Sequence, residues 1–250
     1  MIGFSRRQLL CALGALSLPG LPAAGQGATL RIACIQSDVE AWVARQILAA
    51  IYTQAGLTLQ AEMTPPVRAT VALQAGDVDG ELMRPLSYAD DHPEFIRVPT
   101  PFYRVSVHAY SLPGRKIRID MPDDLWRYSV GVVRGLAVTR ELTSQWPTRQ
   151  VVSALNHELL CRMLKAGRID LAVDTRLRML NMLNHLGMQD TVISPELARF
   201  DLFHFLHKRN AEYAQRIDEA IRRMISSGEL ERQFNAKLRS SVSMRPEQFD

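Results

Sequence analysis

The sequence predicts an α/β protein of two similar lobes, each a mostly parallel sheet flanked by helices, and two observations carry this prediction. The segment 73–84 returns in altered form at 164–176, with leucine, alanine, glycine and aspartate in matching places. Each copy has the pattern of a helix that ends at a left-handed glycine and continues into a short apolar strand. Strand and helix patterns also alternate along both halves of the chain, which favours parallel sheets with right-handed crossovers.

The first half of the chain has the order β-α-β-α-β. Residues 29–36 alternate in polarity and are rich in branched side chains, as strands are. Ser37 and Glu40 have the spacing of a capping box, and apolar residues then recur at helical intervals. A second strand is expected at 57–63, followed by a helix that has prolines in its first turn and ends at Gly76. The repeated segment then supplies the third strand.

The second half repeats this order. Its expected elements are a short helix from 121, a strand at 128–133, a helix to about 145, a short strand at 151–152, a helix from Asn156 to Gly167, a strand at 169–173 and a helix at 175–186. A strand at 200–206 returns the chain to the first lobe, which two amphipathic helices then cover. We expect residues 26–110 and 198–250 to form the first lobe and residues 111–197 the second.

The first 25 residues have the pattern of an export signal of the twin-arginine type. Arg6 and Arg7 precede an apolar run to about Leu18, and small residues follow at 22–25 as a cleavage zone. The apolar run is too short to span a bilayer; a membrane anchor or a disordered basic tail is the alternative. Removal of the signal lowers the formal net charge from +4 to +2. The mature chain therefore lacks the concentrated basic face that nucleic-acid binding needs.

Patterns of metal binding and covalent catalysis are absent from the sequence. It contains no nucleophile elbow, phosphate loop or zinc spacing. His204 and His207 are three apart in a predicted strand, which places them on opposite faces. We therefore expect no metal and no cofactor. Once Cys11 leaves with the signal, Cys34 and Cys161 lie in different halves, and we expect both to be buried and unpaired.

The whole pattern resembles the extracytoplasmic solute-binding proteins of family 3, the type II periplasmic binding proteins that serve ABC importers. The resemblance runs from about Thr29 to Leu238. It rests on segments that occur in the family's order: Leu30-Arg31-Ile32-Ala33, Gly76 to Asp79, Pro101-Phe102-Tyr103, Asp124-Leu125, Val130 to Gly135, Ala166 to Asp170 and Ser227 to Leu230. It implies the two-lobed periplasmic-binding-protein fold with a ligand cleft between the lobes, and a periplasmic location.

One departure from the family concerns the ligand carboxylate. Amino-acid binders of the family carry an arginine shortly before the segment that matches 95–98, and residues 88–94 contain none here. Arg84, at a strand end, could take over because a guanidinium fork grips an oxyanion through two hydrogen bonds. Glu81 could orient Arg84 or accept from the ligand. The alternatives are an exposed arginine beside a turn proline and a solvated carboxylate.

Two further carboxylates are candidates. The resemblance places Asp174 where family members often hold a ligand amine; the alternative is that it only caps its own helix. Asp38 follows the first strand and faces the cleft or belongs to the first turn of a helix.

The remaining candidates are a turn and two aromatic residues. Arg134 and Gly135 precede a helix whose N-terminus can bind an anion, although Gly135 also suits a simple turn. Tyr88 and Phe102 form an apolar wall of the cleft or pack in a lobe core.

These observations favour a monomeric binding protein that closes over a small polar solute, anionic or zwitterionic, such as an amino acid or organic acid. The expected partners are this ligand and the membrane subunits of an ABC permease, with hinges near Ser111 and at 197–200. Two alternatives stay open. One is a dehydratase-like enzyme on the same scaffold, with Glu81 and Asp174 as acid–base groups; the other is a sensory ligand-binding module.

Overall fold

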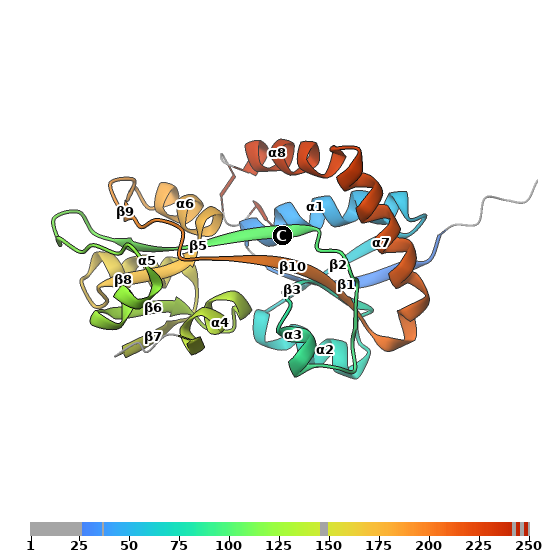
Figure 1. Ribbon diagram of the computed structural model, residues 1–250, viewed down its shortest axis with the longest axis horizontal. Helices are drawn as coiled ribbons and strands as arrows, with labels where there is room; N and C mark the ends of the chain where they lie inside the picture. Colours follow the sequence, from blue (N-terminus) through green and yellow to red (C-terminus); the bar gives the residue numbers. More distant parts are fainter. Residues whose placement is uncertain (1–26, 37, 146–149, 242–243, 246–247, 250) are drawn as a thin grey trace, which may run out of the picture.

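A mixed sheet of ten strands connects both ends of the molecule (Figure 1). The computed structural model describes residues 27–36, 38–145, 150–241, 244–245 and 248–249. The main strand order is β2-β1-β3-β10-β5-β8-β6-β7, with β4 on β10 and β9 on β5. The expected export signal and Ser37 lie outside the described residues.

The strands are β1 (Thr29–Ile35), β2 (Thr58–Thr64), β3 (Gly80–Pro85), β4 (Ile96–Arg97), β5 (Tyr103–Ser111), β6 (Ser129–Val133), β7 (Gln150–Ala154), β8 (Leu171–Thr175), β9 (Val192–Ile193) and β10 (Ala198–Leu206). The helices are α1 (Val39–Gln54), α2 (Pro66–Ala75), α3 (Tyr88–Asp91), α4 (Ala137–Gln145), α5 (His157–Lys165), α6 (Arg176–His185), α7 (Ala211–Ser226) and α8 (Glu229–Ser241), with short turns η1 (Pro122–Arg127) and η2 (Lys208–Asn210).

We call β1–β4 with α1–α3, α7 and α8 the first lobe, and β6–β9 with α4–α6 the second lobe. Within each lobe the leading strand pairs in parallel with two neighbours, β1 with β2 and β3, and β6 with β7 and β8. The expected parallel β-α-β order is therefore present twice. The exact lobe boundaries at 110/111 and 197/198 stay a prediction.

The two long strands β5 and β10 join the lobes. They pair with each other antiparallel, from Ala198 opposite Val107 to Leu202 opposite Tyr103. Beyond that shared stretch β10 continues along β3 and β4, while β5 continues along β8 and β9. Each strand thus belongs to both lobes, and bending or twisting this two-stranded connection is the simplest way to change the angle between them.

The repeated segment has one structural role in both lobes. Gly76 and Gly167 end their helices with φ of +77° and +66°, the left-handed conformation that favours glycine. Asp79 accepts a hydrogen bond from the backbone N–H of Arg31 at 2.8 Å, and Asp170 accepts one from Ser129 at 3.0 Å. Each aspartate therefore fixes the start of its lobe's leading strand, which explains why the repeat keeps it.

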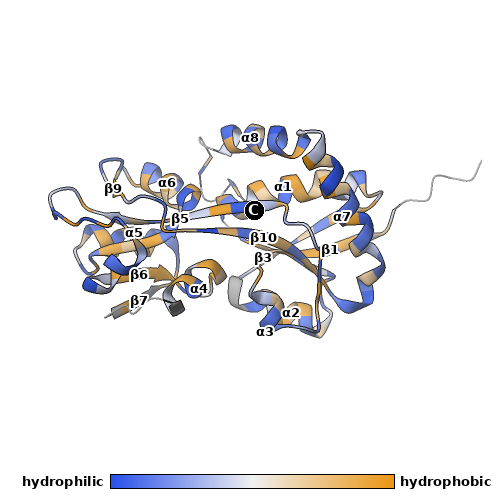
Figure 2. Ribbon diagram, in the orientation of Figure 1, coloured by the Kyte–Doolittle hydropathy of each residue, from blue (hydrophilic) through white to orange (hydrophobic). Residues whose placement is uncertain are grey.

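The cores lie between the sheet and its helices. In the first lobe α1 packs on the sheet and under α7 and α8, with Ile47, Ile51, Ile217 and Ile221 buried together. Figure 2 shows hydrophilic residues along α7 and α8, the amphipathic pattern of covering helices. The last two helices thus pack against α1 of the first lobe. None of the described helices is long and apolar enough to cross a membrane.

Two local predictions have clear outcomes. Cys34 and Cys161 are buried and unpaired, as expected. The capping box is corrected: the N-cap of α1 is Asp38, whose Oδ1 accepts from the backbone N–H of Ala41 at 2.8 Å. Glu40, expected to close the box, is buried and points to another partner.

Candidate functional site between the lobes

A small cavity lies between the two lobes, with a volume of about 30 Å³. Its polar walls are Glu40 and Arg84 from the first lobe and Arg178 from the second. The other walls are mostly apolar: Ile35, Met83, Pro85, Val105, Leu136, Ala137, Val138 and Leu202. This volume suits about one or two water-sized groups, so the lobes are closed against each other.

Arg84 reaches the cavity because of an irregularity in β3. Phe203 of β10 lies opposite Arg84 and Phe205 opposite Glu81, so β3 has one more residue than β10 over this stretch. Such a bulge turns side chains that are three apart towards the same side of the sheet. Glu81 consequently accepts a hydrogen bond from Nε of Arg84.

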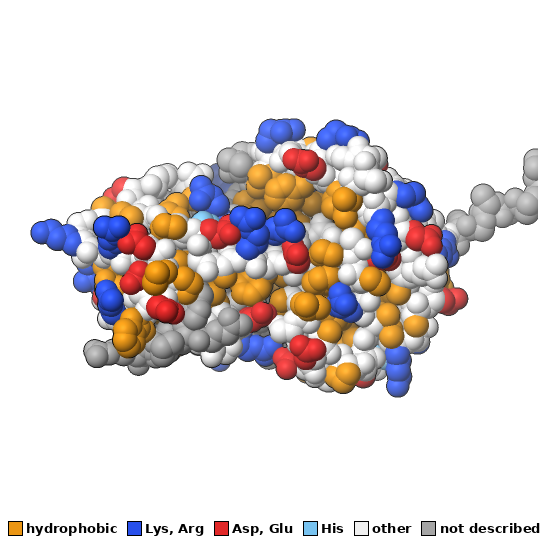
Figure 3. Space-filling model, viewed as in Figure 1, with side chains coloured by type: hydrophobic (Ala, Val, Ile, Leu, Met, Phe, Trp, Pro, Cys, Tyr) orange, Lys and Arg blue, Asp and Glu red, His pale blue; other side chains and the backbone are white. Residues whose placement is uncertain are grey.

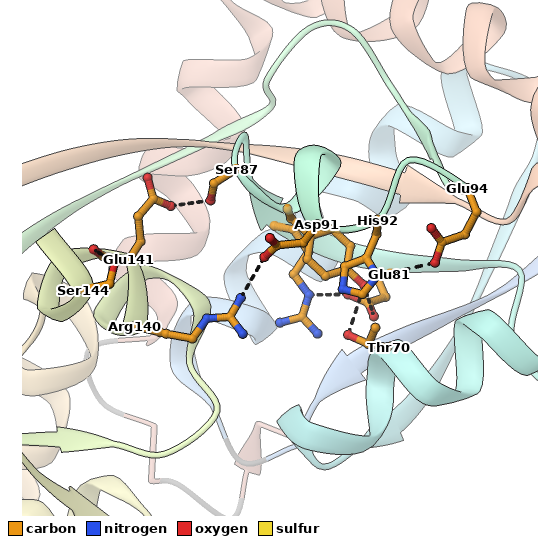
Figure 4. A network of polar contacts seen from close by, with 11 residues as sticks. Thr70, Glu81, Ser87, Asp91, His92, Glu94, Arg140, Glu141 and Ser144 are labelled. Carbon is orange, nitrogen blue, oxygen red and sulfur yellow. Dashed lines mark hydrogen bonds and ion pairs between the residues drawn. The ribbon is translucent and has the colours of Figure 1, made fainter.

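The Arg84 side chain is held by a buried aromatic and acidic pair. Its guanidinium carbon lies 5.2 Å from the ring centre of Tyr88, within the range of a cation–π contact. The Tyr88 hydroxyl lies 3.0 Å from both Glu81 Oε1 and Thr70 Oγ1, and Figure 4 shows Glu81 and Thr70 in this network. Arg84 is 6% exposed, so the alternative of an arginine in solvent is wrong.

A second buried cluster surrounds Arg178 of α6. Its Nε donates to Asp38 Oδ2 at 2.6 Å, and Nη1 lies 3.2 Å from Glu40 Oε2 and 3.5 Å from Asp174 Oδ1. Asp38 and Glu40 belong to the first lobe, whereas Asp174 belongs to the second. His157 completes the cluster, with Nε2 at 3.0 Å from Asp174 Oδ2. One guanidinium therefore ties the two lobes together.

The pKa values of Glu40 and Asp174 are shifted in opposite directions. Burial raises the pKa of Glu40 to about 7, against the opposing effect of Arg178. Burial also acts to raise the pKa of Asp174, but His157, Arg178 and the Thr175 backbone N–H outweigh it and hold that pKa below its ordinary value. The environment thus favours a charged Asp174 and keeps Glu40 poised between its two protonation states near neutral pH.

Two contacts close the opposite side of the cleft, where α3 of the first lobe faces α4 of the second (Figure 4). The Ser87 hydroxyl donates to Glu141 Oε2 at 2.6 Å. Arg140 Nη2 lies 3.5 Å from Asp91 Oδ2, and both side chains are exposed. Since exposed ion pairs contribute little, Ser87 and the buried Arg178 contacts dominate the polar contacts that we find between the lobes.

The structure brings five of the predicted site residues to the two clusters around the cavity: Arg84, Glu81, Tyr88, Asp38 and Asp174. The other three lie elsewhere. Arg134 and Gly135 are exposed in a turn, with Gly135 at a φ of +87°, and α4 starts two residues later. The role of these two residues stays a prediction.

Phe102 lies away from the interlobe cavity. It is buried and contributes to a separate groove of about 610 Å³ beside β5, β10 and α8. The groove's apolar lining includes Tyr103, Ile225, Leu230 and Phe234. Figure 3 shows apolar side chains gathered in a hollow just below α8, in the upper part of the view. Phe102 therefore packs in the core of the first lobe, which is the second of the two placements expected for it, and it does not line the interlobe cavity.

Two further outcomes concern the acidic side of the site. Asp174 is not the N-cap of α6, because Thr175 occupies that position and Asp174 is still in β8. Glu40 and Arg178 were not expected at the site. The sequence assigned Glu40 to a capping box with Ser37, so it was not considered as a residue of the site. One feature of the sequence could have indicated Arg178: it follows Asp174 by four residues, a spacing of about one helical turn that allows the two side chains to meet.

The comparisons with known proteins show the fold. No protein-family model matches the sequence. An uncharacterized protein of Shewanella oneidensis is 27% identical over 190 residues, which is 73% of this chain and 72% of that protein. Among solved structures, an amino acid ABC transporter substrate-binding protein from Streptococcus pneumoniae bound to L-arginine superposes with a TM-score of 0.69 at 16% identity, covering 86% of this chain and 97% of that one.

Two other solved structures have similar scores. A histidine kinase sensor domain with similarity to periplasmic binding proteins has a TM-score of 0.72 at 17% identity, covering 85% and 96% of the two chains. An ancestral amino-acid-binding protein, a precursor of cyclohexadienyl dehydratase, has a TM-score of 0.64 at 14% identity, covering 84% and 95%. The chain therefore has the two-lobed fold of periplasmic binding proteins, and the predicted fold and structural resemblance are confirmed.

Proposed function

We propose that this protein binds a small zwitterionic solute of the amino-acid type in the interlobe cleft and delivers it to an ABC permease in the periplasm. One observation carries the proposal: a guanidinium, Arg84, and a carboxylate, Glu40, wall the same buried cavity. A ligand carboxylate pairs with the first and a ligand amine with the second. Several structural neighbours are amino-acid-binding proteins of ABC transporters, which supports this solute class.

Arg84 is suited to hold the ligand carboxylate. Its Nε is bound to Glu81, and within the described part of the chain its two terminal nitrogens form no well-aligned hydrogen bond and no ion pair, although the Tyr88 hydroxyl is near enough to help raise the pKa of Arg84. Those terminal N–H groups are the ones that form a bidentate contact with a carboxylate. Glu81 and Tyr88 fix the guanidinium in place, which lowers the entropy lost on binding.

Hinge closure accounts for both capture and release. The cavity has walls from both lobes, so a ligand in it favours the closed arrangement by its additional contacts there. Solute entry requires opening, because about 30 Å³ does not admit an amino acid. Opening breaks the contacts of Arg178 with Asp38 and Glu40 and that of Ser87 with Glu141, and β5 and β10 act as the hinge.

A binding screen with an Arg84 variant tests the proposal. We expect the purified protein to show a ligand-dependent rise in melting temperature with one or more amino acids, and calorimetry to give a Kd at least tenfold weaker for Arg84→Met. The variant keeps the apolar stem and removes the charge. Arg118→Met, at a side chain that is 85% exposed, is the matched control. Equal affinities of the wild type and Arg84→Met would remove Arg84 from the site.

Sensing is the second candidate function, since a histidine kinase sensor domain is among the structural neighbours. A sensor would also close on its ligand, but its closed form would bind a receptor domain instead of a permease. Permease and ATPase genes beside this gene favour transport, whereas a kinase gene favours sensing. Conversion of the bound compound, followed by mass spectrometry, would instead indicate an enzyme, as the dehydratase precursor suggests.

A further inference from the structure

The acidic end of the site already contains a cation, which is Arg178. Its side chain is buried, and its guanidinium lies within 2.6 to 3.5 Å of carboxylate oxygens of Asp38, Glu40 and Asp174. Because these carboxylates come from both lobes, the guanidinium occupies the interior of the closed cleft. Burial alone would lower the pKa of Arg178, but the three carboxylates outweigh it and raise that pKa, so the side chain is always charged.

The cluster still has more negative than positive groups. Asp38, Glu40 and Asp174 face the single arginine, with His157 as the only other basic group that the structure places in contact with them. Glu40 Oε2 and Asp174 Oδ2 are buried and lack a well-aligned hydrogen bond among the described residues. Without Arg178 this pocket would hold several buried carboxylate oxygens and no fixed cation, an arrangement that attracts a guanidinium or ammonium group.

We propose that Arg178 determines the ligand class: its guanidinium stands where a cationic ligand side chain would otherwise bind, and it thereby excludes ligands with such side chains. The inference rests on the proposed function, because it refines the solute that the same cleft takes. The accepted ligands are then small zwitterions or anions without a second positive charge, which fits the small, mostly apolar remainder of the cavity. Arg178 also fastens the two lobes in the closed form through Asp38 and Glu40.

Chemical rescue tests this inference without knowledge of the natural ligand. Arg178→Ala removes the guanidinium and leaves the carboxylates in place. We expect methylguanidinium at millimolar concentration to raise the melting temperature of Arg178→Ala in a saturable way, and to bind this variant at least tenfold more tightly than the wild type. Lysine and arginine should likewise gain affinity relative to alanine.

Three variants serve as controls. Arg140→Ala removes another arginine that reaches across the lobes, at an exposed pair with Asp91, and should gain no methylguanidinium binding. Arg178→Lys keeps a cation in the cluster and should also remain insensitive. Adding Glu40→Gln to Arg178→Ala removes one carboxylate and should weaken the rescue. If Arg178→Ala alone does not fold, Arg178→Gln provides the same measurement with a polar side chain of intermediate length.

The outcomes separate this inference from the proposed function. A folded Arg178→Ala or Arg178→Gln protein that binds methylguanidinium no better than the wild type would overturn the role of Arg178, whatever the wild type binds. A wild-type protein that binds no amino acid or organic acid, together with a successful rescue, would overturn the proposed function and leave the assignment of Arg178 intact.

Discussion

At the scale of single residues, the site is defined by how each charge is compensated. Arg84 has one close carboxylate, Glu81, which binds its Nε, and we propose that its terminal nitrogens bind the ligand. Arg178 has three carboxylate neighbours, so its guanidinium forms its ion pairs within the protein itself. Both arginines are buried at the same cleft, but their surroundings differ, and we accordingly propose that Arg84 binds the ligand and that Arg178 excludes cationic ligands.

Glu40 gives a prediction about pH. Its pKa is about 7 in the folded protein because the effect of burial, which raises it, outweighs the attraction of Arg178, which lowers it. The negative charges of Asp38 and Asp174 raise it further. Glu40 in turn helps to raise the pKa of the nearby Tyr103 hydroxyl. In the unfolded chain the carboxyl loses its proton near pH 4.5. Between pH 4.5 and about pH 7 the Glu40 carboxyl is therefore protonated in the folded protein and ionised in the unfolded chain. The contribution of Glu40 to the free energy of unfolding is thus fully present below pH 4.5 and is lost as the pH rises through 7.

The measurement compares the free energy of unfolding of the wild type and Glu40→Gln by urea titration from pH 5 to pH 8. We expect the wild-type value, relative to the variant, to fall as pH rises, by up to about 3 kcal/mol at about 1.4 kcal/mol per pKa unit. Subtraction removes the other titrating groups, which are common to both proteins. A difference that stays constant or rises over this range would contradict the raised pKa of Glu40.

At the scale of elements, the aspartate of the repeat anchors a strand in each lobe. Asp79 accepts from the Arg31 backbone N–H and from Arg209 Nη2 at 2.6 Å, and Asp170 accepts from the Ser129 N–H and hydroxyl. Burial acts to raise the pKa of Asp79, but these donors hold it below its ordinary value. The same local geometry thus serves both lobes. Asp79 also has a close ion pair with Arg209 at 2.6 Å, whereas the ion pair of Asp170 with Arg115 is longer, at 3.6 Å.

Asparagine at these positions tests the anchor. Asp79→Asn keeps the size but loses the charged acceptor, so we expect it to lower the free energy of unfolding by about 1–3 kcal/mol. Asp170→Asn should lower the free energy of unfolding by less, because Asp170 is 3.6 Å from its arginine, Arg115, whereas Asp79 is 2.6 Å from Arg209. Asp77→Asn, at an exposed position in the same turn, should change stability by less than about 0.5 kcal/mol. Equal small effects at all three positions would contradict the anchoring role.

At the scale of the whole molecule, the lobes are connected covalently by β5 and β10 and non-covalently across the cleft. The buried contacts of Arg178 and the Ser87–Glu141 hydrogen bond lie on different sides of the cavity. Both must break for the lobes to separate. Under the proposed function, the balance between open and closed forms depends on these few polar contacts and on the ligand.

Small-angle X-ray scattering tests this balance. We expect the double variant Arg178→Ala/Glu141→Ala, without added ligand, to have a larger radius of gyration than the wild type, because contacts on both sides of the cleft are lost. A saturating amino-acid ligand should reduce the value towards that of the wild type. The double variant Arg118→Ala/Glu158→Ala, at exposed residues with local partners only, should behave as the wild type. An unchanged radius in the first variant would show that other contacts hold the lobes closed.

Much of the fold could be predicted because its signals are local. Alternating apolar residues, the glycines after α2 and α5, and the aspartate that follows each of them all depend on neighbours within one turn or one strand. Part of the candidate site could be predicted for the same reason: Arg84 and Asp174 lie at strand ends, where open α/β sheets commonly present ligand-facing groups. Local rules also misassigned Glu40, since its spacing from Ser37 imitates a capping box.

The sequence by itself determined the order of elements, the two-lobed plan and the strand ends that carry polar groups. Only the tertiary structure decided which groups meet across the cleft. Arg178 and Asp38 are 140 residues apart, and a contact over such a distance follows from the relative placement of two lobes, which no local periodicity encodes. The bulge that turns Arg84 and Glu81 to one side is likewise a property of the pairing between β3 and β10, so it appears only when both strands are in place.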